Sequence, residues 1–157
     1  MRTAYKVLAY LVAAEVAIQA MVMVWFIAGL GKWVEGGGVL DKAAMESEVT
    51  PPFPEAAGMI AHINNGFFVI PGLALLLLII SFFTKVRAAI KWAVVVFVLV
   101  IVQTQLGGLG HDFPLAGALH GLNALALFGA AIFAGRRLRA AAPGTVDREQ
   151  ARAATPV

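Results

Sequence analysis

The chain contains no cysteine and has few charged residues. Without cysteine it forms no disulfides, offers no thiolate ligands and carries out no thiol redox chemistry. Charged residues make up only 13% of the sequence, and the net charge of +3 comes from clustered ends rather than from a basic face. No nucleic-acid partner is therefore expected, and any metal must be bound by histidine, carboxylate or methionine.

Apolar residues dominate instead. They account for 61% of the 157 residues, and the mean hydropathy is +0.85, far from the composition of soluble domains. The sequence therefore predicts an integral membrane protein with a single domain. Its spans must pack against each other, because the lipid bilayer satisfies no backbone polar group.

Four apolar runs are long enough to cross a bilayer as helices, for which about twenty residues suffice. We expect an all-α fold: a four-helix transmembrane bundle over residues 1–139, built from two parallel-repeated helical hairpins. The tail, 140–157, is rich in Ala, Pro and Thr and is predicted to be disordered and cytoplasmic. The predicted spans are about 4–31, 58–83, 88–106 and 115–135.

Lysine and arginine residues lie on one side of this predicted bundle. Arg2 and Lys6 precede the first span, three cations lie in the loop of residues 84–91, and three arginines follow the fourth span. The positive-inside rule therefore places both termini in the cytoplasm and the protein in the plasma membrane. The first run continues beyond the length of a signal peptide, so we expect it to remain as a helix.

Two histidines lie a few residues inside apolar runs. His62 and His120 are each followed three residues later by an asparagine, Asn65 and Asn123. Each histidine is about five residues past the outer end of its span, or about 8 Å below the outer boundary. We expect the imidazoles to share a layer near the outer face, together with Gln105.

Small residues lie one turn away from both histidines, on the same helical face. A flat macrocycle held edge-on between two helices needs such clearance, and two neutral imidazoles can take the axial positions of a haem iron. We therefore predict a haem b site, with Asn65 and Asn123 as hydrogen-bond donors to a propionate or ring edge. The small residues are Gly58 and Gly66 around His62, and Gly117 and Ala124 around His120.

Other interpretations of these polar residues stay open. Small residues at such spacing also permit close helix packing, so each His–Asn pair can serve as an inter-helix hydrogen-bond pair. Glu15 and Gln19 share one face of the first span near mid-membrane. They form either a proton or quinone site or a buried pair facing other amides. His111 lies in a Gly-rich outer loop, where we expect a solvated residue without a ligand role.

The chain resembles one four-helix half of haem A synthase over roughly residues 5–136. The similarity rests on Gln103-Thr104-Gln105-Leu106-Gly107-Gly108, on a short loop with Pro114, and on His120 early in the next span. Such a half carries paired histidines in its second and fourth helices near the outer face, so the resemblance implies a b-type haem pocket. The whole chain also resembles a family of small actinobacterial four-span integral membrane proteins, which implies no activity.

The chain departs from the synthase pattern at positions that bear on catalysis. The family's catalytic half has Glu four residues before the span-two histidine and Arg just after it, where this chain has Gly58 and Ile63. Its cysteine pair and second four-helix half are absent too. The resemblance therefore implies haem binding for electron transfer or haem handling, with a membrane redox partner or quinone, but not haem oxidation. The alternative is a cofactor-free membrane subunit or a small-molecule-binding protein.

Overall fold

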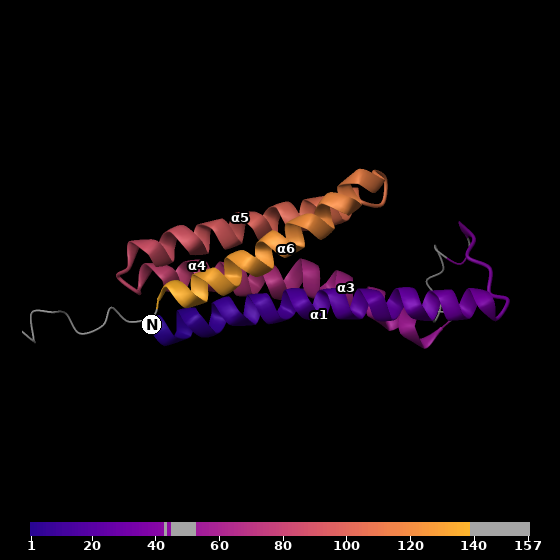
Figure 1. Ribbon diagram of the computed structural model, residues 1–157, viewed down its shortest axis with the longest axis horizontal. Coiled ribbons are helices and arrows are strands. Elements are labelled where there is room, and N and C mark those ends of the chain that lie inside the picture. The colour runs from indigo at the N-terminus through magenta and orange to yellow at the C-terminus, as the bar shows by residue number, and fades with distance from the viewer. Residues whose placement is uncertain (43, 45–52, 139–157) are drawn as a thin grey trace, which may run out of the picture.

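The computed structural model describes residues 1–42, 44 and 53–138. Within these residues, four helices are long and apolar enough to cross a membrane, and there is no β-strand. The chain is an all-α four-helix bundle of the multi-pass membrane class, as the sequence predicts (Figure 1). The predicted tail, 140–157, lies outside the described residues.

The bundle consists of two hairpins whose spans end within a few residues of the predicted positions. In the first hairpin α1 packs against the second span, which follows a short 3-10 turn, η1, and contains a π-helical turn, η2. The second hairpin pairs α5 with α6. The elements are α1 (Arg2–Glu35), η1 (Pro54–Ala56), α3 (Ala57–Asn64), η2 (Asn65–Val69), α4 (Ile70–Phe82), α5 (Arg87–Leu109) and α6 (Pro114–Arg137).

The second span changes helix type near its middle. The Ile70 N–H donates to the Asn65 carbonyl oxygen five residues back, which is the π-helical pattern. Pro71 follows, and because it has no N–H it interrupts the regular α-helical ladder. Single π-helical turns are frequent at functional sites. This one begins three residues after His62.

The connected apolar core occupies only the half of the bundle that lies near the N-terminus. In this half α1, α4, α5 and α6 form a closed ring in which each helix packs against two neighbours. Farther along, α3 packs on α1 while α5 and α6 diverge from that pair (Figure 1). The fully buried core residues come from residues 5–16 of α1, 70–77 of α4, 89–100 of α5, and 127–138 at the end of α6.

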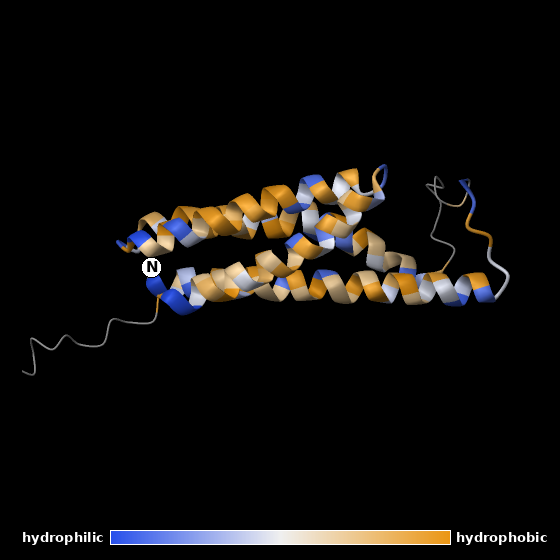
Figure 2. Ribbon diagram, turned by 45° about the horizontal axis from the view of Figure 1, so that its top comes forward, coloured by the Kyte–Doolittle hydropathy of each residue, from blue (hydrophilic) through white to orange (hydrophobic). Residues whose placement is uncertain are grey.

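Large apolar side chains cover the outside of the spans. Phe68, Leu115 and Leu125 are 73%, 72% and 71% exposed. Hydrophobic residues extend along most of the length of every span, whereas hydrophilic residues gather toward the helix ends and at a level within the bundle (Figure 2). A surface of this kind is an aggregation hazard in water. In a bilayer it contacts acyl chains, which agrees with a multi-pass membrane protein.

We predict that the α4–α5 turn faces the cytoplasm and the α5–α6 turn faces the outside, because the loop cations lie in the former. The substitutions Phe83→Cys and Asp112→Cys place single thiols at exposed positions of the two turns, in a chain without native cysteine. An impermeant maleimide should label position 112 in intact cells and position 83 only after permeabilisation. The reverse labelling pattern would contradict this orientation.

Candidate functional site

The two histidines meet just beyond the end of the apolar core. The ring centroids of His62, on α3, and His120, on α6, are 6.0 Å apart, and the ring planes are inclined by 61°. Both side chains are half-buried. The structure therefore brings together the two imidazoles that come from different hairpins and that the sequence places at similar depth.

A backbone carbonyl of the same hairpin orients each imidazole. His62 Nδ1 lies 3.3 Å from the Gln19 carbonyl oxygen, and His120 Nδ1 lies 3.0 Å from the Gln103 carbonyl oxygen. Because a carbonyl oxygen can only accept, Nδ1 of each ring carries the proton. Each Nε2 then keeps its lone pair, which is the tautomer that a metal ligand requires.

The side chains of the same two glutamines make a second contact with each histidine. Gln19 Nε2 donates to the His62 carbonyl oxygen over 3.0 Å. Gln103 Nε2 donates to His120 Nε2 over 3.2 Å. The lone pair of His120 is thus held by an amide, whereas His62 Nε2 has no hydrogen-bond partner within the part of the chain that the structure describes.

The two asparagines bind inside their own hairpins. Asn65 Nδ2 donates to Glu15 Oε2 over 2.7 Å. Asn123 Nδ2 donates to Gln103 Oε1 over 2.6 Å and to the Leu99 carbonyl oxygen over 3.0 Å. In both hairpins the asparagine donates to the residue one helical turn before the glutamine. That residue is Glu15 in the first hairpin and Leu99 in the second, so the two hairpins repeat one arrangement. This geometry favours a role in holding the helices over the predicted contact with a haem edge.

Of the small residues near the histidines, Gly58 serves close helix packing, whereas Gly117 lies at ordinary van der Waals distance from its neighbours. A Cβ atom added at Gly58 would lie 2.5 Å from the Val22 carbonyl oxygen, so α3 packs there directly on α1. A Cβ atom added at Gly117 would lie 3.7 Å from the Gly110 Cα across the α5–α6 turn. Both glycines therefore face the partner helix of their own hairpin.

Two other glycines leave room for the polar side chains. A Cβ atom at Gly66 would lie 3.1 Å from Gln19 Nε2. A Cβ atom at Gly107 would lie 3.0 Å from Cε1 and 3.1 Å from Nδ1 of His120. Ala124, one turn after His120, packs against the apolar core. Gly107 is thus a site residue that the sequence analysis names only as part of a motif.

Gln103, not Gln105, is the glutamine that reaches His120. Gln105 is exposed and forms none of the hydrogen bonds found among the described residues. Two residues along an α-helix turn the side chain by about 200°, so only one of these glutamines faces α6. Gln103 lies one helical turn before Gly107, so the two residues share a face of the helix. This spacing in the sequence could have identified Gln103 as the glutamine that faces His120.

The separation of the histidines fits axial ligation of one iron. A metal–imidazole nitrogen bond is about 2 Å, so two imidazoles on opposite sides of one iron have centroids roughly 6 Å apart, close to the 6.0 Å found here. Within the described ranges, no group of three or more His, Cys, Asp or Glu side chains can hold a bare metal ion. Two histidines alone suit an iron whose other ligands come from a macrocycle.

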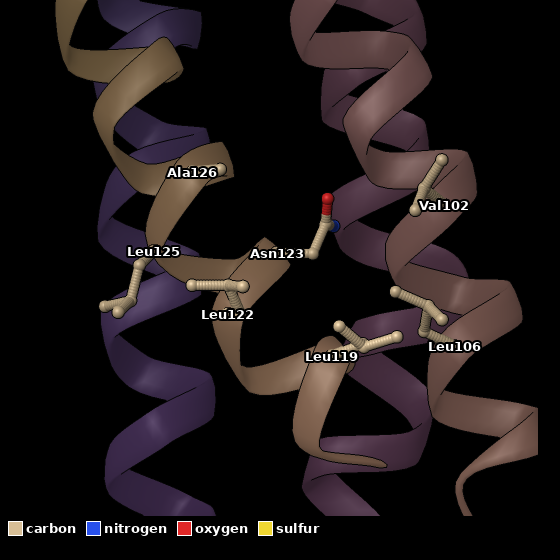
Figure 3. A pocket seen from close by; sticks show the side chains of 7 residues that line it. All are labelled: Val102, Leu106, Leu119, Leu122, Asn123, Leu125 and Ala126. Atoms are coloured by element: carbon tan, nitrogen blue, oxygen red, sulfur yellow. The ribbon is translucent and has the colours of Figure 1, made fainter. Parts of the chain in front are cut away.

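An apolar groove of about 740 Å³ lies between α5 and α6 beside this site. Asn123 is the polar member of its lining, and its side chain extends between the two helices (Figure 3). The groove is open to the outside and not an enclosed cavity, and its lining suits an apolar chain. The apolar lining residues are Val102, Leu106, Leu119, Leu122, Leu125 and Ala126.

Comparison with known proteins gives no relative for this chain. No protein-family model matches it. No curated protein and no solved structure gives a significant match either. The resemblance to haem A synthase therefore stays a prediction, and function is inferred from the geometry of the site.

We predict that Gly107→Ala lowers the stability of the protein while Gly108→Ala raises it. Alanine stabilises an unobstructed helix position over glycine by about 0.5–1 kcal/mol, and nothing lies within 4 Å of a Cβ atom at Gly108. At Gly107 the methyl group meets the His120 imidazole, and overpacking costs about 1–3 kcal/mol. Thermal unfolding in detergent measures the difference. Equal Tm values for the two variants would show that His120 does not pack on Gly107.

Proposed function

We propose that this chain is a membrane protein that binds one haem b through His62 and His120 and serves electron transfer or haem handling. The observation that carries the proposal is the contact of two correctly protonated imidazoles, 6.0 Å apart, just beyond the end of the apolar core. A bound haem would supply a one-electron redox centre at this level of the membrane.

The incomplete core supports a ligand between the hairpins. Close packing of the four helices ends near Val16 and Val100, the last buried core members of α1 and α5. Beyond them the side chains that face the bundle interior are histidines and amides. Polar groups at membrane depth are costly and usually mark a functional pathway or a bound group, so a ligand that fills the outer half would complete the bundle.

The glutamine backbone prepares both histidines for iron. The carbonyl oxygens of Gln19 and Gln103 hold the Nδ1 protons and the ring orientations. Such hydrogen bonds raise the basicity of a histidine ligand. The Gln103 side chain acts in the opposite sense, because its amide holds the Nε2 lone pair of His120 and must move before that nitrogen can bind iron.

A membrane-soluble redox carrier is the partner class that we propose. The groove beside Asn123 offers an apolar surface within the bilayer, next to the helix that carries His120. The tail of a quinone has the chemistry for such a groove. With both termini in the cytoplasm, the haem would lie near the outer face of the plasma membrane.

A cofactor-free role is favoured by one observation. Both ring nitrogens of His120 already have partners on Gln103, at 3.0 and 3.2 Å. His120 can therefore act as an inter-helix hydrogen-bond group that holds α6 on α5. The chain would then be a membrane subunit or a small-molecule-binding protein whose polar layer stabilises the hairpins.

We predict that protein purified from haem-replete cells has the spectrum of a six-coordinate, low-spin haem. His62→Ala and His120→Ala should each abolish haem binding or leave a five-coordinate, high-spin haem, because each removes one axial ligand. His111→Ala is the matched control and should leave the spectrum unchanged, because His111 is exposed in the α5–α6 turn. Absorption spectra distinguish these results. Colourless protein that fails to bind haemin at one per chain would establish the cofactor-free role instead.

We also predict that Gln103→Leu strengthens haemin binding by about two- to tenfold. The substitution removes the amide that competes with iron for His120 Nε2, and one hydrogen bond contributes about 0.5–1.5 kcal/mol. The backbone carbonyl that holds Nδ1 remains in place. Gln105→Leu, on the exposed face of the same helix, should not change the affinity. Weaker haemin binding by Gln103→Leu in a titration would mean that its amide assists the site.

A further inference from the structure

The two hairpins place a glutamine, a histidine and an asparagine alike but differ in how the glutamine and asparagine side chains are paired. In the second hairpin both polar atoms of the Gln103 amide have partners, since Nε2 donates to His120 and Oε1 accepts from Asn123. In the first hairpin, Glu15 occupies the position that corresponds to Leu99. Asn65 turns to the Glu15 carboxylate, so it does not donate to the glutamine of its own hairpin.

Two buried acceptor oxygens of the first hairpin have no donor, and one of them, Gln19 Oε1, corresponds to an oxygen that is paired in the second hairpin. Gln19 Oε1 and Asn65 Oδ1 are buried and have no hydrogen-bond partner within the described residues. Gln19 is only 9% exposed. An unpaired buried acceptor costs about 1–3 kcal/mol. In the second hairpin the glutamine amide has partners for both of its polar atoms and does not incur that cost. We infer that the unpaired oxygens of the first hairpin bind a ligand that is not part of the chain.

Among the described residues, the Glu15 carboxylate has no cationic side chain as its partner. Glu15 lies near mid-membrane in α1, and its hydrogen-bond donor is the Asn65 amide. The described lysine and arginine residues are found toward the helix ends and in the turns. A carboxylate within a bilayer is costly unless an opposite charge accompanies it.

We propose that Glu15, Gln19 and Asn65 bind a small monovalent cation such as sodium. Carboxylate and amide oxygens are the ligands that hard cations prefer. One carboxylate balances one positive charge, whereas a divalent ion would leave a net charge inside the membrane. The unpaired amide oxygens are buried, so the ion loses water on their side of the site, which favours a small ion.

The π-helical turn supplies a further oxygen to this cation site. The Ile70 N–H donates to the Asn65 carbonyl and so is not the donor to the Gly66 carbonyl. Pro71, the next residue, has no N–H to offer. The Gly66 carbonyl oxygen therefore lacks a regular helical partner, and Gly66 packs against the Gln19 side chain. The cation site gives the π-helical turn a function that is independent of haem.

Sodium binding to the full-length protein in detergent tests this inference directly. Equilibrium binding of radioactive sodium should give one ion per chain. The Tm should rise saturably with sodium chloride when choline chloride keeps the ionic strength constant. Glu15→Gln should weaken sodium binding by more than about tenfold and remove the rise in Tm. Glu35→Gln is the matched control on the same helix, at an exposed position, and should retain both.

A second variant keeps the test decisive where Glu15→Gln does not fold. Asn65→Asp retains an oxygen at the position of the unpaired acceptor and adds a second carboxylate, so sodium binding should persist and calcium should now compete with it. Wild-type protein with identical Tm values in sodium and choline would overturn the proposal. Undiminished sodium binding by folded Glu15→Gln would also overturn it, because the carboxylate would then have no part in binding.

Discussion

Lipid offers no hydrogen bonds, so every polar group within a span must find its partner inside the protein. The polar residues here meet that requirement largely within their own hairpins. The carbonyl oxygens of Gln19 and Gln103 accept the Nδ1 protons of the two histidines. These bonds leave both Nε2 atoms unprotonated, although the Gln103 amide donates to that of His120. Which nitrogen is available decides whether a histidine can bind a metal, so the proposed haem chemistry depends on two backbone carbonyls.

The same requirement explains where the bundle is closely packed. Small residues such as Ala9, Ala74 and Ala93 are fully buried and allow the helices to approach each other in the half near the termini. The opposite half has polar side chains at the corresponding interior positions, and these satisfy one another within a hairpin instead of forming a four-helix core. The two hairpins are therefore joined firmly at one end and meet through the histidines beyond it.

The two hairpins place their glutamine, histidine and asparagine residues alike, so the differences in pairing are informative. Leu99 contributes only its carbonyl oxygen to the network of the second hairpin, whereas Glu15 contributes a charged side chain to the first. Asn65 therefore donates to Glu15 and not to Gln19, whose Oε1 is left unpaired. Our two proposals assign two polar functions to the hairpins: a metal-ligand pair shared between them and an oxygen-lined cation site in the first alone.

The sequence by itself determined the number of spans, their approximate ends and the similar depth of His62 and His120. These features depend on hydropathy and on the rise per residue, which are properties of one chain segment at a time. Tertiary structure alone decided that Gln103 and not Gln105 reaches His120, and that Gly58 packs on a helix of its own hairpin. These contacts depend on how each helix is rotated about its axis against its neighbour. Residue spacing does not fix that rotation, because a long apolar helix is nearly uniform around its circumference and side-chain packing between helices selects the orientation.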